Sequence, residues 1–425
     1  MTIKLGVIAD DFTGATDIAS FMVQSGWRVV QLLVAPDENT VVPQNIDAIV
    51  ISLKSRSCPV DEAVNNSLKS CRWLRQEAGC QRIFFKYCST FDSTSKGNIG
   101  PVTDALMGEL NADITLICPA LPVNGRTVVH GHLFVNGQRV NKSGMQHPPI
   151  TPMKDANLIR LMEQQAQGKT GLVDLTCVHQ GEQAIRKQLN KLQQQGIRYA
   201  VVDAMSMNDL LPIASAVSEL TLVTGGSGLG AALASTNTGK LLSPPQPEGA
   251  TPPAQNRRPV ILSGSCSVMT NKQVAQYQKL DPTQSLDIGL CLHDPQYAGQ
   301  LVEWIMQPSE NNLAPMLYST QLPETLQKIQ QQYGATTASE AIENTFASIV
   351  KSLQQRWFNT FIIAGGETAG KIVQSLDIQQ FSIGAPIAPG VPWVHDLQHN
   401  HWLALKSGNF GDINFFLHAQ EMFHE

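Results

Sequence analysis

Three acidic residues follow a short apolar run near the start of the chain. Residues 7–17 read VIADDFTGATD, so Asp10 and Asp11 end the run and Asp17 comes shortly after them. Adjacent carboxylates repel each other unless a metal ion, a substrate hydroxyl or an arginine satisfies them. Asp17 has a simpler explanation, because Thr16 or Asp17 could cap the helix expected next. We therefore predict that Asp10 and Asp11 belong to a substrate or metal site, with a solvated acidic turn as the alternative.

Two further strand ends in the first half of the chain carry charged and hydroxyl side chains. The segment VISLKSRS supplies Arg56, whose planar guanidinium suits a carboxylate, although a surface ion pair would also explain it. The segment IFFKYCSTFDSTSKGNIGP runs from a strand into a polar loop that favours ligand binding over a plain turn. That loop offers Lys86, Ser89, Thr90, Asp92 and Lys96.

The segment VVHGHLFV holds His130 and His132. On a strand, this spacing would point both imidazoles to one face. No third ligand follows nearby, so we predict no metal site here. His130 is a candidate hydrogen-bond partner for the substrate, and a structural histidine is the alternative.

Glycines end three predicted strands in the second half of the chain. The segments are ILSGS, IIAGGET and ALKSGNFG, and the first two lead into predicted helices whose free N–H groups attract phosphate. These turns predict a nucleotide platform. The stretch GGETAGK also resembles a Walker A loop, but Ile372 stands where that loop needs a hydroxyl for Mg²⁺. We interpret the Walker match as fortuitous.

A fourth glycine turn lies in the first half, where Gly226, Gly228 and Ala231 match the dinucleotide pattern G-x-G-x-x-A. The acidic residue expected about 20 residues later is missing, and a proline-rich stretch follows instead. A turn that closes the first domain is therefore favoured over an NAD site. Whether this turn touches substrate stays open.

Short apolar runs alternate with amphipathic stretches in both halves, which predicts βαβ units. Asn136-Gly137 indicates one local hairpin. Residues 243–259 contain six prolines and predict a linker. The expected fold is two α/β domains with mainly parallel sheets, residues 1–242 and 260–425. Ligands of such sheets bind beyond the carboxyl ends of the strands, where the residues above lie.

Composition limits the function classes. The 425 residues are 42% hydrophobic and 15% charged, and the net charge of −5 leaves no basic stripe for nucleic acid. No run of about 18 apolar residues predicts a membrane span. Eight cysteines without a CxxC pair indicate reduced thiols in a cytoplasmic protein.

Taken together, the motifs resemble the four-carbon acid sugar kinases, which are ATP-dependent kinases of small sugar acids. IADDFTGATD is similar to the N-terminal signature of that family, and AGGETA and KSGNFG are similar to its nucleotide-domain signatures. KYCSTFDSTSKGNIGP resembles the branch that forms 4-phosphates of 3-oxo-tetronates. The resemblance covers nearly the whole chain. It implies a sugar-acid domain, residues 1–242, followed by a nucleotide domain, residues 260–425, with the active site in the interdomain cleft.

The resemblance also implies roles for individual residues. ATP would phosphorylate the C4 hydroxyl of a four-carbon 3-oxo acid, Asp10 or Asp11 would deprotonate that hydroxyl, and Arg56 would grip the substrate carboxylate. The substrate pocket would comprise Thr13, Arg56, Lys86, Ser89, Thr90, Asp92 and His130. The ATP site would comprise Ser263, Ser265, Gly365, Gly366, Glu367, Thr368, Gly408 and Gly411.

Mg²⁺ would bridge the phosphates, with Glu367 as a residue that could position it. No nucleic-acid or membrane partner is expected, and a homodimer is an option. Three alternatives stay open: a threonate or erythronate kinase of the same family, an NAD-linked oxidoreductase, and a two-domain acid-binding protein.

Overall fold

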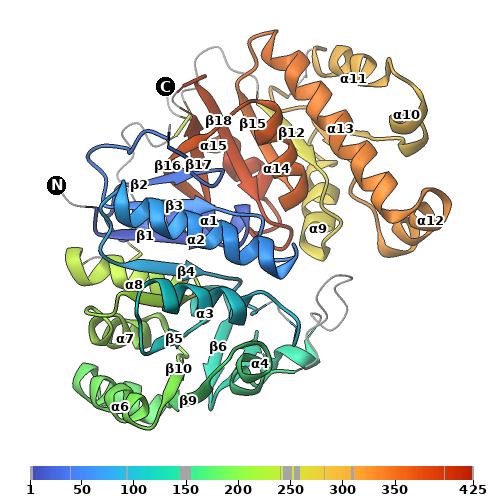
Figure 1. The fold of residues 1–425 in the computed structure, drawn as a ribbon. Helices are drawn as coiled ribbons and strands as arrows, with labels where there is room; N and C mark the ends of the chain where they lie inside the picture. Colours follow the sequence, from blue (N-terminus) through green and yellow to red (C-terminus); the bar gives the residue numbers. More distant parts are fainter. Residues whose placement is uncertain are drawn as a thin grey trace. The chain divides into compact units, whose positions relative to one another are not determined.

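The computed structural model divides into two compact units, Met1–Pro244 and Pro245–Glu425. Figure 1 colours the first unit blue to green and the second yellow to red. The residues that the structure describes are 3–38, 40–91, 94–143, 155–239, 241–242, 251–252, 259–281, 283–307, 311–396 and 398–423. The predicted linker 243–259 lies outside the described residues except at 251, 252 and 259.

The main sheet of the first unit has five parallel strands in the order β11-β4-β1-β3-β2. The strands are β1 (Leu5–Ala9), β2 (Val29–Leu32), β3 (Ala48–Ser52), β4 (Ile83–Lys86) and β11 (Leu222–Gly225). Every residue of β1, β3, β4 and β11 is buried, as expected for a parallel sheet covered on both faces. The predicted parallel sheet is therefore confirmed for this unit.

Helix α1 (Phe12–Gln24) begins earlier than the sequence pattern indicated. Asp11 is its N-cap residue and accepts the Gly14 N–H at 2.6 Å. Thr16 and Asp17 are buried inside the helix, so the prediction that one of them caps it is wrong. The reason is local, because Asp11 follows the strand directly and already supplies the cap.

Two smaller sheets complete the first unit. Strands β5 (Thr115–Ile117), β10 (Ile197–Val202) and β9 (Lys169–Val173) are parallel. Strands β6 (Arg126–Val129), β7 (His132–Val135) and β8 (Gln138–Arg139) are antiparallel. Asn136 and Gly137 both have positive φ between β7 and β8, which confirms the predicted hairpin.

His130 does not lie on a strand. It occupies the turn between β6 and β7 with φ 49°, and Gly131 follows with φ 69°. The prediction that His130 and His132 share one face of a strand is therefore wrong. The turn forms because Asp203, at the end of β10, accepts the N–H groups of His130 at 2.8 Å and Gly131 at 2.9 Å.

The sheet of the second unit has the order β16-β17-β18-β15-β12-β14-β13. Strands β18 (His401–Lys406), β15 (Thr360–Ala364), β12 (Val260–Ser263), β14 (Met316–Tyr318) and β13 (Thr283–Ser285) are parallel. Strands β16 (Gln380–Ala388) and β17 (Val391–Asp396) add an antiparallel edge. The second unit is thus also a mainly parallel α/β fold.

The three predicted glycine segments fold as expected. Helix α9 (Val268–Tyr277) follows β12, helix α14 (Gly366–Ser375) follows β15, and a loop follows β18. The core beneath them includes Trp393, Trp402, Phe415 and Phe416. All eight cysteines are free thiols, and no helix in the described part of the chain could cross a membrane.

Candidate active site

Three central strands of the first unit end side by side, and backbone hydrogen bonds tie their ends together. The Asp10 N–H donates to the Lys86 carbonyl at 3.0 Å, which joins β1 to the end of β4. The Asp10 carbonyl accepts the N–H groups of Ser55 at 3.0 Å and Arg56 at 3.1 Å, just beyond β3. The carboxyl ends of these strands therefore bring together four predicted site residues, Asp10, Asp11, Arg56 and Lys86.

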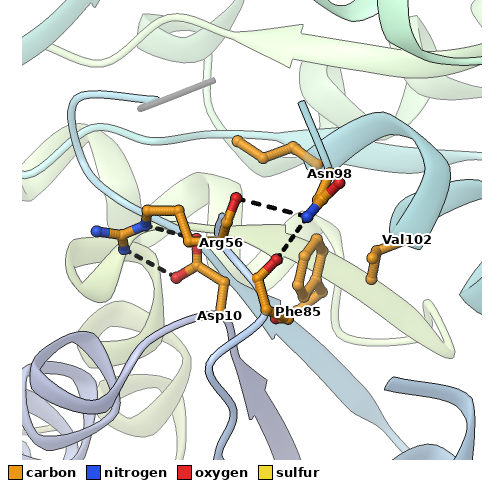
Figure 2. A pocket seen from close by; sticks show the side chains of 7 residues that line it. Asp10, Arg56, Phe85, Asn98 and Val102 are labelled. Carbon is orange, nitrogen blue, oxygen red and sulfur yellow. Dashed lines mark hydrogen bonds and ion pairs between the residues drawn. The ribbon is translucent and has the colours of Figure 1, made fainter. Parts of the chain in front are cut away.

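Arg56 balances the two adjacent acids. Its Nε and one terminal nitrogen donate to the two Asp10 carboxylate oxygens at 3.0 and 2.9 Å, as Figure 2 shows. Its other terminal nitrogen lies 2.8 Å from Asp11 Oδ2. A metal ion, a substrate hydroxyl or an arginine was expected to offset the repulsion between Asp10 and Asp11. In the structure, Arg56 has this role. A contact between Arg56 and the substrate carboxylate stays a prediction.

The ion pair sets the charges of this group. Burial raises the pKa of Asp10, whereas the charge and hydrogen bonds of Arg56 oppose that rise. Burial lowers the pKa of Arg56, but the carboxylates of Asp10 and Asp11 more than compensate and hold it well above its usual value. Arg56 therefore stays charged at any pH at which the protein is folded. Asp11 has the more accessible carboxylate, since its side chain is 26% exposed and that of Asp10 only 5%.

Lys86 places a second cation beside the acids. Its ammonium is buried and donates to the Tyr87 carbonyl at 3.0 Å. A methyl group on Gly14 would overlap the Asp11 carboxylate and lie 3.0 Å from Lys86 Nζ. Gly14 is therefore the residue that lets helix α1 start between this lysine and Asp11. A buried ammonium that donates to a single carbonyl within the described residues can attract an anionic ligand.

Asp17 belongs to the same group, although the sequence reading assigned it only a helix-end role. Ser227, in the first turn of helix α8 (Ser227–Thr238), donates to Asp17 Oδ2, and Asp17 Oδ1 is buried without a hydrogen-bond partner in the described chain. Burial raises the pKa of Asp17 to about 6, against the opposing effects of Lys86 and Ser227. A helix that begins at Phe12 places Asp17 in its second turn, where it cannot be a cap. The sequence would have indicated another role for Asp17 if the start of the helix had been predicted correctly.

The glycine turn before α8 is explained by close packing. A methyl group on Gly226 would lie 2.6 Å from the Pro119 carbonyl oxygen, and one on Gly228 would lie 2.7 Å from that of Ala120. A methyl group on Gly230 would lie 2.7 Å from the Ile18 side chain of α1. These glycines let α8 approach the chain after β5 and α1, so the expectation of a turn that closes the first domain fits the structure.

Asn98 supports the loop that carries Arg56. Its amide donates to the carbonyls of Ser55 at 2.7 Å and Cys58 at 2.9 Å. A small hollow beside this amide is lined by Asp10, Ser55, Arg56, Phe85, Asn98, Ile99 and Val102, and Figure 2 shows Asn98 and Arg56 at its wall. Sequence reasoning missed Asn98, because a side chain that binds only backbone leaves no pattern in the sequence.

The other predicted substrate residues are not tied to the group of Asp10, Asp11 and Arg56 by side-chain hydrogen bonds that the structure describes. Thr13 lies in the first turn of α1, next to Asp11. Ser89 and Thr90 follow β4, and Thr90 is buried with its hydroxyl 2.8 Å from Cys88 Sγ. Asp92 lies outside the described residues. In the described chain, no hydrogen bond or ion pair joins His130 to Asp10, Asp11 or Arg56.

The three glycine loops of the second unit converge at neighbouring strand ends. The N–H groups of Gly264 and Ser265 donate to the Ala364 carbonyl at 2.8 and 3.1 Å, and the Gly365 N–H donates to the Lys406 carbonyl at 2.9 Å. Ser263 is buried, and its hydroxyl lies 2.7 Å from that of Thr320. The predicted nucleotide residues on β12, β15 and β18 thus form one cluster.

Lys406 locks the third loop and was not foreseen. The Gly408 carbonyl accepts three hydrogen bonds, from Ser267 Oγ at 2.6 Å, Thr270 Oγ1 at 2.7 Å and Lys406 Nζ at 2.8 Å. Lys406 is fully buried, and burial lowers its pKa to about 7. A methyl group on Gly408 would lie 2.9 Å from Ser265 Oγ, so a side chain there would force two of the loops apart.

The N-termini of the two helices in this cluster differ. Ser267 caps α9 and accepts the Thr270 N–H at 3.2 Å. The N-cap residue of α14 is Gly365, with φ 123°, and no side chain of the described chain caps this helix. The first N–H groups of α14 are thus open to an anion, and Gly366 and Glu367 are exposed. Lys371 lies in the middle of α14, which confirms that the Walker match is fortuitous.

Comparisons with known proteins agree with this arrangement. Residues 5–233 match a sugar-binding N-terminal domain model, and residues 260–416 match a nucleotide-binding C-terminal domain model. A 3-oxo-tetronate kinase of Pectobacterium atrosepticum is 52% identical over 99% of both chains. One of Haemophilus influenzae is 52% identical over 99% of this chain and all of its own. This chain belongs to the four-carbon acid sugar kinase family.

Two solved structures share the fold of this chain over nearly its whole length. A structure from Salmonella typhimurium LT2 is 49% identical with a TM-score of 0.90, over 99% of this chain and all of the other. A Haemophilus influenzae structure is 51% identical with a TM-score of 0.81, over 98% of this chain and all of the other. The chain is accordingly a kinase-family enzyme with two α/β units and a nucleotide-binding domain.

Proposed function

We propose that this protein transfers the γ-phosphoryl group of ATP to the C4 hydroxyl of a 3-oxo-tetronate. The observation that carries the proposal is the identity of about half of all residues, over the full chain length, with 3-oxo-tetronate kinases of several organisms. The geometry supports it, because acids and cations cluster in one unit while glycine loops and an uncapped helix cluster in the other.

The acceptor would bind at the acid cluster of the first unit. Asp11 is the better base, since its carboxylate is the more accessible of the pair and Arg56 holds it through one oxygen. Asp10 would hold Arg56 in place through both of its oxygens. The Lys86 ammonium would attract the anionic sugar acid, with Thr13 at the rim. In such transfer reactions, position and charge supply most of the rate enhancement.

ATP would bind at the glycine loops of the second unit. The N–H groups of the exposed Gly366 and Glu367 suit phosphate oxygens, and the glycines at 365 and 408 leave the loops without covering side chains. The buried Thr368 would support them from the first turn of α14. Ser263, Ser265 and Gly411 belong to the same predicted cradle. Mg²⁺ would neutralise charge on the phosphates when bound, and the exposed Glu367 carboxylate fits a role in holding it.

The test is ADP release by the purified full-length protein with Mg-ATP, coupled to a reporter enzyme. The panel of acceptors contains 3-oxo-tetronates, threonate, erythronate and glycerate. We expect turnover with a 3-oxo-tetronate and a product with the phosphate on C4, as read by phosphorus and carbon NMR. Turnover only with threonate or erythronate would support the kinase activity but reject 3-oxo-tetronate as the substrate. ADP release that no acid stimulates would reject the proposal.

A further inference from the structure

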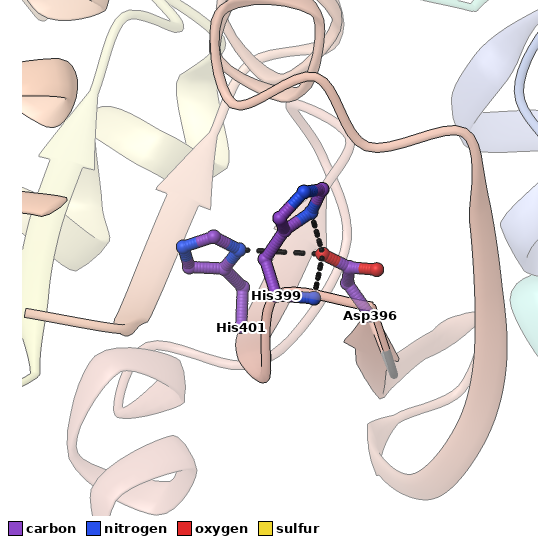
Figure 3. A group of neighbouring side chains, drawn as sticks. All are labelled: Asp396, His399 and His401. Carbon is purple, nitrogen blue, oxygen red and sulfur yellow. Dashed lines mark hydrogen bonds and ion pairs between the residues drawn. The ribbon is translucent and has the colours of Figure 1, made fainter.

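Two histidines and one aspartate meet at the tip of a hairpin in the second unit. Asp396 ends β17, and His401 begins β18. His399 lies in the turn between them, and Figure 3 shows both imidazoles directed at the Asp396 carboxylate. One ligand atom of each residue can be chosen so that all three lie within 4.8 Å of one another. These residues lie at the start of β18, whereas the Gly408 loop follows the other end of that strand.

Both imidazoles use the same nitrogen toward the same oxygen. His399 Nδ1 lies 2.9 Å and His401 Nδ1 lies 3.3 Å from Asp396 Oδ2. A tetrahedral Zn²⁺ with nitrogen and oxygen ligands at about 2.0–2.1 Å separates its ligands by about 3.3 Å. The two separations from Asp396 Oδ2, 2.9 and 3.3 Å, are thus close to the spacing of ligands around such an ion.

The charges also favour a cation here. Asp396 is 1% exposed, and no lysine or arginine among the described residues forms an ion pair with it. Buried carboxylates are usually paired with a cation or coordinate a metal. Among the described residues, the other hydrogen bonds to the Asp396 carboxylate come from the backbone N–H groups of Gln398 at 3.0 Å and His399 at 3.2 Å, which orient the carboxylate without neutralising it.

The surroundings hold the ligands in place and leave one side accessible. His401 Nε2 lies 3.4 Å from the side-chain amide nitrogen of Gln354, on helix α13 (Ala335–Gln354). With Nδ1 on a metal, Nε2 would carry the ring proton, so the Gln354 amide would have to turn its oxygen toward the ring to accept it. The next ring along the hairpin, that of His395, stacks on Trp402 with centroids 4.1 Å apart. The His399 side chain is 33% exposed, which gives an ion a path from solvent.

We propose that Asp396, His399 and His401 form a binding site for a divalent transition-metal ion of the Zn²⁺ class. Two imidazoles and one carboxylate suit Zn²⁺ and its neighbours, with water as the fourth ligand, whereas Mg²⁺ prefers six oxygen ligands. The site is therefore distinct in chemistry from any Mg²⁺ that accompanies ATP. A bound ion would brace the hairpin at the start of β18, the strand whose other end carries Lys406 and the Gly408 loop.

The test is calorimetric titration of Zn²⁺ into chelator-treated full-length protein in the presence of millimolar Mg²⁺. We expect one saturable equivalent that Mg²⁺ does not displace, and a rise in the melting temperature of the protein. His399→Ala should weaken this binding at least about tenfold and remove the rise. Because His399 is exposed, the variant should fold, which circular dichroism checks.

His179→Ala is the matched control. His179 is also an exposed histidine near a carboxylate, 3.3 Å from Asp209, but no third ligand group was found beside it in the described chain. This change should leave the Zn²⁺ equivalent intact. The proposal is overturned if wild-type protein binds no stoichiometric Zn²⁺ in the presence of Mg²⁺. It is equally overturned if His399→Ala binds as tightly as wild type, or if His179→Ala weakens the binding as much.

Discussion

The two candidate ligand sites of this chain are built by different means. In the first unit, charged side chains from three strand ends neutralise one another, with Arg56 between Asp10 and Asp11 and Lys86 beside them. In the second unit, backbone groups and hydroxyls dominate, and Lys406 serves to fix a loop. A site that deprotonates a hydroxyl needs a carboxylate held in position by neighbouring charges. A phosphate-binding site needs backbone N–H groups without partners and enough space for the phosphate oxygens.

This difference decides how each site responds to mutation. Removal of one charge from the first site leaves its partner buried and unpaired, which is costly for folding. Addition of one methyl group in the second site crowds the loops and should weaken ligand binding more than folding.

Arg56→Ala should cause the largest loss. Asp10 would keep a buried carboxylate without its partner, so the free energy of unfolding should fall by about 3–5 kcal/mol, together with activity. Urea unfolding measures the change. Arg72→Ala is the control, because Arg72 forms an equally short but exposed pair with Glu109 at 2.7 Å and its loss should destabilise the protein far less. Equal losses in the two variants would contradict a buried, structural role for the Arg56 pair.

Asp11→Asn should reduce kcat by about 10²–10⁴ while the protein still folds and binds ATP. Asparagine is as good an N-cap as aspartate, so helix α1 should keep its start and the Gly14 contact. Steady-state kinetics and an ATP titration measure the two properties. A variant that turns over at the wild-type rate would remove Asp11 as the base.

Asp17→Asn should change how stability depends on pH. The pKa of Asp17 is about 6 in the folded protein and about 3.9 in the unfolded chain, so between these values the native state binds more protons. Wild-type stability should therefore fall as pH rises from about 4 to 6, by up to about 3 kcal/mol from this group. The variant lacks that contribution, and urea unfolding at several pH values compares the two.

Asp47→Asn is the control for the sign of this effect. Although burial raises the pKa of Asp47, backbone and side-chain hydrogen bonds from Arg28 and Lys4 lower it below its usual value. That group contributes stability at neutral pH that is lost as the pH falls. The difference between variant and wild type should thus run in the opposite direction to that of Asp17→Asn. The same direction in both would contradict a raised pKa for Asp17.

Gly408→Ala should have the smallest of these effects. The added methyl group would lie 2.9 Å from Ser265 Oγ, so the loops must separate slightly, and ATP affinity should fall about tenfold. Gly299→Ala in helix α11 (Tyr297–Ile305) adds the same group where no atom lies within 4 Å, and ATP affinity should not change. If ATP affinity were unchanged in Gly408→Ala, the Gly408 loop would not be part of the nucleotide-binding site.

Much of this architecture could be predicted from local sequence. The apolar runs of β1, β3 and β15 are buried strands, and the glycine turns after β12 and β15 lead into helices as expected. Residue types alone also identified Asp10, Asp11 and Arg56 as a group of interest. These features are readable because each depends on neighbours in the chain.

Pairing between distant residues could not be predicted. Arg56 lies 46 positions from Asp10, and Ser227 lies 210 positions from Asp17. The turn at His130 depends on Asp203, and no sequence period reports such a contact. Lys406 was missed because a fully buried lysine is rare, and only the surrounding carbonyls explain it.

The division of labour between the two units is tested most directly by equilibrium binding of both ligands to two variants. Lys86→Met removes the buried ammonium at similar volume, and Gly408→Ala crowds the glycine loops. Calorimetry with ATP and, separately, with the 3-oxo-tetronate should show that Lys86→Met weakens only acid binding and Gly408→Ala weakens only ATP binding. If Lys86→Met weakened ATP binding instead, or Gly408→Ala weakened acid binding instead, the assignment of the two sites would be wrong.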